Sequence, residues 1–168
     1  LPAPPKNFIT EDQQINKLNL IPDTSWDNSI FNYWTVGTKQ AHNKCARFIR
    51  NQITLYKDNR DHPSIQGTSL LSPYIHFGEI STRNIWNDIT NKFGPVNTIT
   101  NSGVLQFLKE LVWRDFSYYL LYHFPSITNK PLQQKFLKFP WKNNKTHLRL
   151  WQKGLTGYPI VDAGMREL

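Results

Sequence analysis

The stretch LKELVWRDF, residues 108–116, places a carboxylate, an indole and a guanidinium close together in one predicted helix. Glu110, Trp113 and Arg114 stand among leucines and aromatic residues, where a simple core helix would carry apolar side chains. An indole can stack on a planar ligand, a carboxylate can hydrogen-bond to it, and a guanidinium can bind an anion. The stretch therefore predicts either the wall of a binding pocket or a polar surface beside a core.

Helical periodicity separates two faces of this segment, because each residue advances about 100° around the axis. One face is apolar and predicts the core side; it comprises Val104, Leu105, Leu108, Leu111, Val112 and Tyr119. The other face comprises Phe107, Glu110, Trp113 and Arg114. Glu110 and Arg114 are four residues apart with the acid first, so a solvated helix ion pair is the simpler interpretation of this face. Asp115 falls on the apolar face, where it would need a buried partner.

A second candidate site is the stretch GTSLLSP, residues 67–73. Thr68, Ser69 and Ser72 place three hydroxyl groups around a tight turn that leads into a helix beginning near Pro73. Backbone N–H groups at a helix N-terminus, with the positive end of its dipole, favour a phosphate group. Ordinary helix capping by Ser72 is the alternative. The stretch lacks the glycine spacing and the lysine of a Walker A loop.

Helical signals dominate the elements that must position these residues. We expect helices from Thr38 to about Tyr56, from the cap Ser81 to about Asn91, and from Ser102 to about Tyr122. Ile80 and Ile85 are spaced to form a hydrophobic staple around the Ser81 cap. Shorter helices are predicted in SPYIHFG, in THLRLWQKG up to Gly154, and from Pro159 onward. No alternating strand pattern of useful length occurs, so the predicted fold class is all-α.

The amino-acid composition and net charge of the chain limit the classes of function it can have. Lysine and arginine outnumber the acids 20 to 12 in the 168 residues, and the net charge of +8 favours an anionic partner such as nucleic acid. The single cysteine, Cys45, excludes an internal disulfide framework and suits a reducing cytoplasm. No window is apolar enough to span a bilayer. His42 and Cys45 are three apart but lack convergent partners, so no metal site is predicted.

Three long motifs together carry a resemblance to a known family: GTSLLSPYIHFGEIS, KELVWRDF and WQKGLTGYPIVDAGMREL. In this order and spacing they closely resemble the flavin-binding domain of the DNA photolyase and cryptochrome family. The resemblance implies an all-helical domain that holds FAD. Residues 30–168 would form its N-terminal part, truncated at the C-terminus. Residues 1–29, which open with the proline-rich LPAPPK, would be a linker and irregular segment from an upstream α/β domain. A second, antenna chromophore of folate or deazaflavin type is expected only on that upstream domain.

The resemblance also assigns roles by matching position. Glu110 and Trp113 match residues that line the pocket for the damaged base, and Arg60 matches a DNA-contacting arginine. Trp141 matches the outermost member of the tryptophan chain that photoreduces the flavin, while Trp151 is expected to serve packing. At Phe107 some members of the family carry a tryptophan beside the flavin. The implied flavin-binding residues are Tyr56, Thr68, Ser69, Leu70, Leu71, Ser72, Phe107 and Arg114.

The function implied is light-driven DNA repair. Excited reduced FAD would donate an electron to a cyclobutane pyrimidine dimer flipped out of the duplex, which makes the enzyme a carbon–carbon lyase acting on damaged DNA. We expect a cytoplasmic monomer whose present stretch alone is inactive, because further flavin-facing residues of the family lie beyond it. The alternatives are a cryptochrome that signals without repair, a (6-4) photolyase, or a helical DNA-binding or interaction module without flavin.

Overall fold

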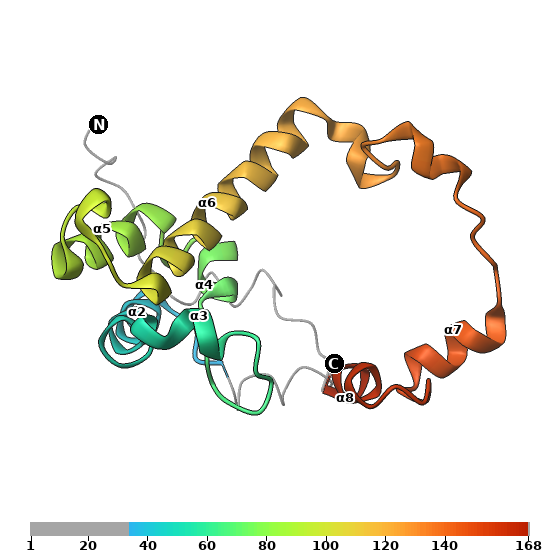
Figure 1. Ribbon diagram of the computed structural model, residues 1–168, viewed down its shortest axis with the longest axis horizontal. Helices are drawn as coiled ribbons and strands as arrows, with labels where there is room; N and C mark the ends of the chain where they lie inside the picture. The colour runs from blue at the N-terminus through green and yellow to red at the C-terminus, as the bar shows by residue number, and fades with distance from the viewer. Residues whose placement is uncertain (1–33, 168) are drawn as a thin grey trace, which may run out of the picture. The chain divides into compact units, whose positions relative to one another are not determined.

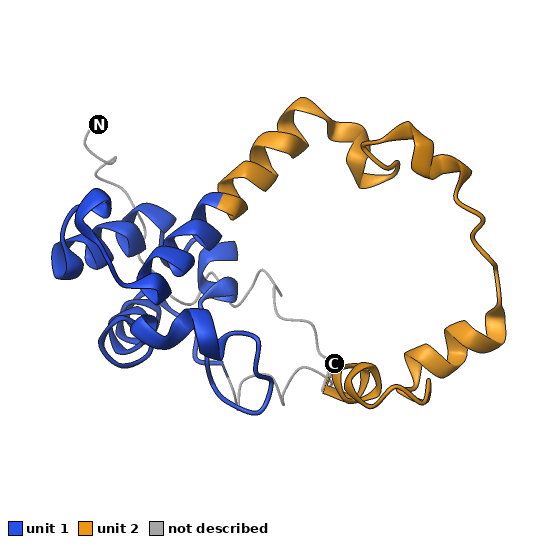
Figure 2. Cartoon of the chain, viewed as in Figure 1, with its two compact units in different colours: residues 1–112 blue, residues 113–168 orange. Residues whose placement is uncertain are grey.

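The computed structural model describes residues 34–167, and within that range it contains helices and turns but no strand (Figure 1). This agrees with the predicted all-α class. The chain divides into two compact units, residues 1–112 and residues 113–168, which are described separately (Figure 2). The predicted linker at residues 1–29 lies outside the described residues. None of the described helices is long and apolar enough to cross a membrane.

The first unit begins with α2, Thr38–Asn51, which buries Ala41, Cys45 and Phe48 along one face. The prediction that this helix continues to Tyr56 is wrong, because the backbone breaks at Gln52 (φ −127°). A 3-10 turn, η2 (Ile53–Leu55), and a short helix, α3 (Tyr56–Asn59), follow. Ile53 and Tyr56, which follow the break, are both buried in the core.

The predicted start of the next long helix is confirmed. Helix α5, Thr82–Phe93, follows α4 (Ser72–His76) and is capped by Ser81, whose hydroxyl accepts the Asn84 N–H at 3.1 Å. Ile80 and Ile85, on either side of the cap, are both buried. The apolar residues beside the cap therefore fix the angle at which α5 enters the core.

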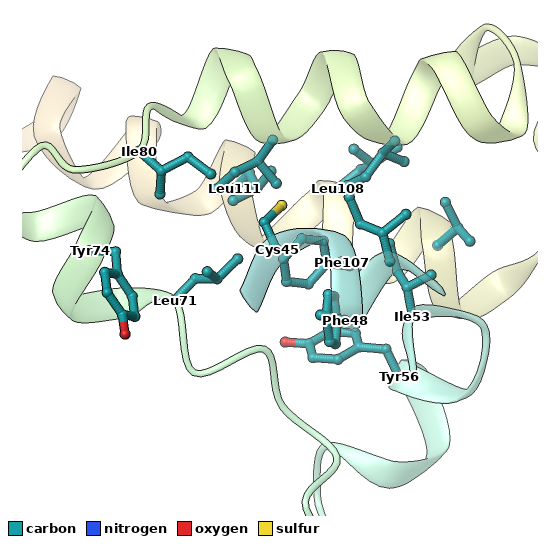
Figure 3. Close-up of a cluster of buried hydrophobic side chains, with 14 of the residues drawn as sticks. Cys45, Phe48, Ile53, Tyr56, Leu71, Tyr74, Ile80, Phe107, Leu108 and Leu111 are labelled. Carbon is teal, nitrogen blue, oxygen red and sulfur yellow. The ribbon is translucent and has the colours of Figure 1, made fainter. Parts of the chain in front are cut away.

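The core of the first unit collects side chains from α2, η2, α3, α4, α5 and the N-terminal half of α6 (Figure 3). Cys45 is fully buried there, and burial together with nearby Asp88 raises the pKa of its thiol to about 12. The thiol therefore stays neutral and serves packing. After the turn η3 (Val96–Thr98), α6 spans Ser102–His123, close to its predicted bounds. Its first turn is closed by the Asn101 side-chain oxygen, which accepts the Val104 N–H at 3.0 Å.

The second unit contains the C-terminal half of α6, two 3-10 turns and two shorter helices. The turns are η4 (Pro125–Thr128) and η5 (Gln134–Lys138), and the helices are α7 (Lys145–Gln152) and α8 (Pro159–Glu167). Asp162 of α8 is buried and accepts hydrogen bonds from the Thr156 hydroxyl (2.6 Å) and from the Thr156 and Gly157 N–H groups (2.7 and 2.9 Å). These hydrogen bonds, the hydroxyl of Thr156 foremost, lower the pKa of Asp162. The aspartate thus ties the turn in GLTGYPIVDAG to the helix that follows it.

Candidate functional site

The first unit brings together Arg60 and Glu110, two predicted site residues that are 50 positions apart in the sequence. The Arg60 Nη1 donates to Glu110 Oε1, and Gln106 Nε2 donates to the same oxygen at 2.8 Å. Both charged side chains are about 30% exposed, at 30% and 31%. The pair therefore sits at a surface that remains accessible to a ligand.

These contacts also fix the charge state of Glu110. Partial burial acts to raise its pKa, but hydrogen bonds from Arg60 and Gln106 outweigh burial and leave the pKa below its ordinary value. The carboxylate is therefore ionised at neutral pH and offers only acceptors. The expected i, i+4 ion pair between Glu110 and Arg114 is wrong, because Glu110 takes Arg60 and Gln106 as its partners instead.

We expect the substitution Arg60→Gln to raise the pKa of Glu110, because it removes the charged donor that favours the ionised form. The pKa of Glu110 is lower in the folded protein than in the unfolded chain, so its ionised carboxylate stabilises the fold at any pH above the unfolded-state pKa. This stabilisation is lost as the pH falls through the folded-state pKa. The variant should lose that stabilisation at neutral pH. Carboxyl ¹³C NMR titration of Glu110, assigned with Glu110→Gln, measures the shift.

The variant Arg60→Lys is the matched control because it keeps the positive charge. Its Glu110 pKa should stay between those of the wild type and Arg60→Gln. An unchanged Glu110 pKa in Arg60→Gln would show that the pair does not form in solution.

An aromatic cluster adjoins the ion pair. The ring centroids of Phe48 and Phe107 lie 4.7 Å apart, and Tyr56 packs edge-on against Phe107 at 5.1 Å (Figure 3). Arg60 lies over the ring of Tyr56, with its guanidinium carbon 5.4 Å from the centroid. Burial raises the pKa of Tyr56, so its hydroxyl remains a hydrogen-bond donor.

Phe107 is therefore part of the core, and the expectation that it belongs to the polar face of its helix is wrong. Its side chain is buried, between residues that also line the core (Figure 3). The physical reason is its position only about 40° around the helix from Leu111, so that its large ring reaches the apolar interior. A role beside the flavin stays a prediction for this residue.

The predicted phosphate-binding turn has an unusual backbone. Leu70 has a φ of 52°, the only left-handed non-glycine residue in the described chain, and Leu71 after it is in the right-handed helical region. Successive residues of opposite hand direct neighbouring N–H groups to one side, which forms an anion-binding concavity. The Ser69 hydroxyl accepts the Leu71 N–H at 3.3 Å. The backbone N–H groups of this turn are therefore arranged so that they could bind an anion.

Two details of this turn differ from expectation. Ser72 is the first residue of α4 rather than its cap; Leu71 is the cap residue and no side chain caps the helix. Helix α4 has only five residues, so its dipole is small and contributes little to anion binding. Leu71 itself is buried, and any contact it makes to a ligand would come from its backbone.

A pocket of about 350 Å³ opens beside the turn, entirely within the first unit. Thr68, Ser69 and Leu70 contribute to its lining, as does Phe48 of the aromatic cluster. Lys44 and Arg47 of α2 supply positive charge to the same pocket. The predicted hydroxyl turn and the aromatic cluster are therefore connected through one lining residue, Phe48.

The second unit holds the remaining predicted residues. Trp113 is 60% exposed and Trp141 is 82% exposed. Arg114 pairs with Asp115 at 3.6 Å and donates to the Tyr118 hydroxyl at 3.3 Å. The side chain of Asp115 is 64% exposed, so the prediction that it faces the core and needs a buried partner is wrong.

Two other expectations fail in this part of the chain. Val112 and Tyr119, predicted as core residues, are exposed because the buried face of α6 ends at Leu111. Trp151, predicted to pack, is 47% exposed. Within residues 34–167 no group of three or more metal-ligating side chains converges.

Comparison with known proteins identifies the family. The profile described as the FAD binding domain of DNA photolyase matches residues 107–168. A deoxyribodipyrimidine photo-lyase of Agrobacterium fabrum is 36% identical over 99% of this chain and 36% of the relative. The crystal structure of a bacterial class III photolyase from Agrobacterium tumefaciens superposes with a TM-score of 0.79 at 37% identity, covering 91% of this chain and 31% of that one. The chain belongs to the DNA photolyase and cryptochrome family.

A cryptochrome is also similar to this chain. Cryptochrome-1 of Arabidopsis thaliana is 32% identical over 98% of the chain and 26% of the relative. The chain thus spans about a third of the length of the curated relatives it matches. The helical fold found in residues 34–167 is that of part of the family's FAD-binding domain.

Sequence reasoning missed three residues of this candidate site. Lys44 and Arg47 are three apart on the polar face of α2, a spacing that places two cations on one surface, but nothing local connects them with the turn at residues 67–72. Gln106 is four residues before Glu110, and an i, i+4 hydrogen bond between these side-chain types was predictable from spacing alone.

Proposed function

We propose that the protein to which this chain belongs is a light-driven DNA repair enzyme that splits cyclobutane pyrimidine dimers with FAD. The observation that carries the proposal is the pairing of Arg60 with Glu110 beside the aromatic cluster of Tyr56 and Phe107. The pair provides an ionised carboxylate and a cation at an accessible surface, as a DNA lesion with flanking phosphates requires. The similarity to deoxyribodipyrimidine photo-lyases supports the same function.

The residues of the first unit fit FAD as the cofactor. The opposite-handed Leu70–Leu71 backbone, the hydroxyls of Thr68 and Ser69, and the cations in the adjoining pocket suit the flavin's diphosphate. Tyr56 offers a hydroxyl donor, and Phe107 an aromatic edge beside it. Two further predicted flavin contacts are Ser72, which would contribute a hydroxyl group, and Arg114, which would contribute a guanidinium group. Bound FAD, once reduced and excited by light, would supply an electron that opens the dimer's cyclobutane ring and then returns to the flavin.

The protein side chains have separate tasks toward the lesion. The Glu110 carboxylate accepts hydrogen bonds from dimer N–H groups and so holds the base edge in a defined orientation. Arg60 balances the charge of Glu110 and presents its guanidinium toward the phosphates that flank the lesion. Trp113, whose ring is mostly exposed, provides a flat surface on which the extruded bases stack.

A cryptochrome that responds to blue light without repair is the second candidate. The similarity to Cryptochrome-1 over nearly the whole chain favours it. Residues that hold FAD would then keep their roles, while the Arg60–Glu110 pair would have no lesion to bind.

Repair of a defined lesion tests the proposal and separates the two candidates. The full-length protein with FAD is mixed with an oligonucleotide that carries one thymine dimer, in the dark or under near-ultraviolet light. We expect light-dependent recovery of the ultraviolet absorbance of the thymine bases. A preparation that binds FAD and yet leaves the dimer intact would favour the cryptochrome, and one that cannot be loaded with FAD would contradict both candidates.

Trp141→Phe should slow photoreduction of oxidised FAD while repair by chemically pre-reduced enzyme proceeds at the wild-type rate. Trp141 is 82% exposed, as an outermost relay residue that exchanges electrons with solvent must be, and phenylalanine is much harder to oxidise. Flavin absorbance under illumination with an external reductant measures the rate. Trp151→Phe is the matched control and should photoreduce normally; equal rates in all three proteins would remove Trp141 from the relay.

A further inference from the structure

A long stretch of the second unit contains basic residues and no acidic residue (Figure 2). From Phe116 to Val161 the sequence has seven lysine or arginine residues and no aspartate or glutamate. The net charge of the whole chain is +8, so this stretch carries all but one of those charges. Three of its cations precede Trp141 and four follow it: Lys130, Lys135, Lys138, Lys142, Lys145, Arg149 and Lys153. The positive charge of the chain is therefore concentrated around one tryptophan.

The charges of this stretch are not neutralised by nearby acids. All seven cations are exposed, and none forms an ion pair with an acidic side chain in the part of the chain that the structure describes. Lys145 and Arg149 lie one turn apart on α7, where like charges repel each other. Ammonium and guanidinium groups are rarely buried without a partner, so they stay in contact with solvent or with anions in the whole protein. This surface therefore suits an anionic partner.

The tryptophan at the centre of this basic surface is held in place and open to solvent. Trp141 is the most exposed tryptophan of the described chain, at 82%. Phe139 packs against it with the ring centroids 4.6 Å apart, and the backbone N–H of Trp141 donates to the Phe139 carbonyl at 2.8 Å. These two contacts orient the indole while most of its surface faces solvent. A small molecule in solution can therefore reach the ring directly.

Lys138 and Lys142 bring positive charge close to this indole. They lie three residues before and one residue after Trp141, so their Cα atoms are at most about 11 Å from its Cα atom. The Debye length is about 8–10 Å at ordinary ionic strength, so their field is only partly screened at the indole. Charge of one sign around a site raises the local concentration and the association rate of counter-ions by about 10- to 1,000-fold in favourable cases. Small anions should therefore reach Trp141 faster than neutral molecules do.

We propose that this basic surface guides small anionic electron donors to Trp141. The inference rests on the proposed role of Trp141 as the outermost residue of the relay, and it names the class of molecule that restores this residue. After Trp141 has given one electron to the relay, an anionic donor such as ascorbate gives one electron to the oxidised indole. The indole returns to its neutral form, and the ascorbate monoanion becomes the ascorbyl radical and releases a proton to water. The lysines take no part in the transfer itself; they raise the rate at which donor and indole meet.

Flash photolysis of the full-length protein with FAD measures how fast a donor reduces the Trp141 radical. The decay of the indole radical absorbance is followed at low salt as ascorbate, or the uncharged donor hydroquinone, is increased. The double variant Lys138→Gln/Lys142→Gln should slow the ascorbate reaction about three- to tenfold and leave the hydroquinone reaction unchanged. Added salt should slow the ascorbate reaction of the wild type toward that of the double variant. The matched control Lys39→Gln/Arg83→Gln removes two exposed cations from α2 and α5 and should react like the wild type.

Quenching of tryptophan fluorescence tests the same surface without light-driven chemistry. The contribution of Trp141 is the difference between each protein and the same protein with Trp141→Phe. Iodide, an anion, should quench Trp141 less in the double variant than in the wild type, while uncharged acrylamide should quench both equally. Equal ascorbate rates in the wild type and the double variant overturn the inference and leave the relay intact. The absence of a Trp141 radical contradicts the relay, and the inference with it.

The result does not depend on whether the protein repairs dimers. A cryptochrome with the same relay would give the same rates, so failed repair of the thymine dimer leaves the inference standing. DNA is the other anionic partner that the surface could serve. An undamaged duplex that prevents iodide quenching of Trp141 and binds the double variant more weakly would assign the surface to DNA and overturn the inference. Far-ultraviolet circular dichroism of each variant confirms that it is folded.

Discussion

Trp113→Ala should weaken the binding of dimer-containing DNA to the full-length protein by about 5- to 150-fold, since base–aromatic stacking contributes roughly 1–3 kcal/mol per base. Trp113 is 60% exposed even though Phe116 packs edge-on against its ring, with the centroids 5.7 Å apart. Fluorescence anisotropy with a labelled duplex that carries one dimer measures the affinity. Binding of undamaged duplex should change much less, because it depends mainly on phosphate contacts.

Two matched variants separate stacking from other effects at this position. Trp113→Phe keeps an aromatic face and should retain most of the affinity. Glu110→Ala should lower the quantum yield of repair more than it lowers lesion binding, because the carboxylate orients the base edge for electron transfer. The opposite pattern, with binding lost in Glu110→Ala and repair lost in Trp113→Ala, would show that the two roles are exchanged.

Features governed by neighbouring residues were predictable from the sequence. Ser81 and the flanking isoleucines predict the start of α5. Apolar residues recurring at helical spacing predict α6, with a C-terminal end within one residue of the observed one. Each of these signals depends on residues within about a turn of the helix. The all-α class follows from the same local patterns.

Features that depend on contacts distant in the sequence were not predictable in this way. Spacing paired Glu110 with Arg114, whereas the folded chain pairs it with Arg60, which the break at Gln52 and the short helix α3 bring to α6. The helical wheel likewise placed Asp115 toward a core that ends at Leu111. A helical wheel shows on which face of a helix a side chain lies. Only the tertiary structure determines how much of that face is covered by other elements.

The same limit applies to the candidate site. The resemblance identified the turn at residues 67–72, but Lys44 and Arg47 lie twenty or more residues earlier, on another helix. Their role depends on the loop being held against α2, which the Gln52 contact to the Gln66 carbonyl achieves. Local spacing could show that α2 has a basic face. It could not show that this face lies beside the turn at residues 67–72.

Gly103→Ala should lower the stability of the full-length protein by about 1–3 kcal/mol, the usual range for added volume in a packed region. A Cβ at position 103 would meet the backbone carbonyls of Ile53 and Thr54, which cannot rotate away as a flexible side chain could. Helix α6 therefore packs against η2 with no room for even a methyl group. The shift in the urea midpoint of unfolding, followed by circular dichroism, measures the loss.

Gly164→Ala is the matched control, because no described atom outside its own helix lies within 4 Å of the added Cβ. This change should be neutral or stabilise the protein by up to about 1 kcal/mol, since alanine favours a helix over glycine. Gly103→Ala should also weaken FAD binding, because displacing Ile53 and Thr54 moves Tyr56, which begins the next helix. Equal unfolding midpoints for the wild type and Gly103→Ala would contradict the close approach of α6 to η2, and with it the positioning of Tyr56 by that contact.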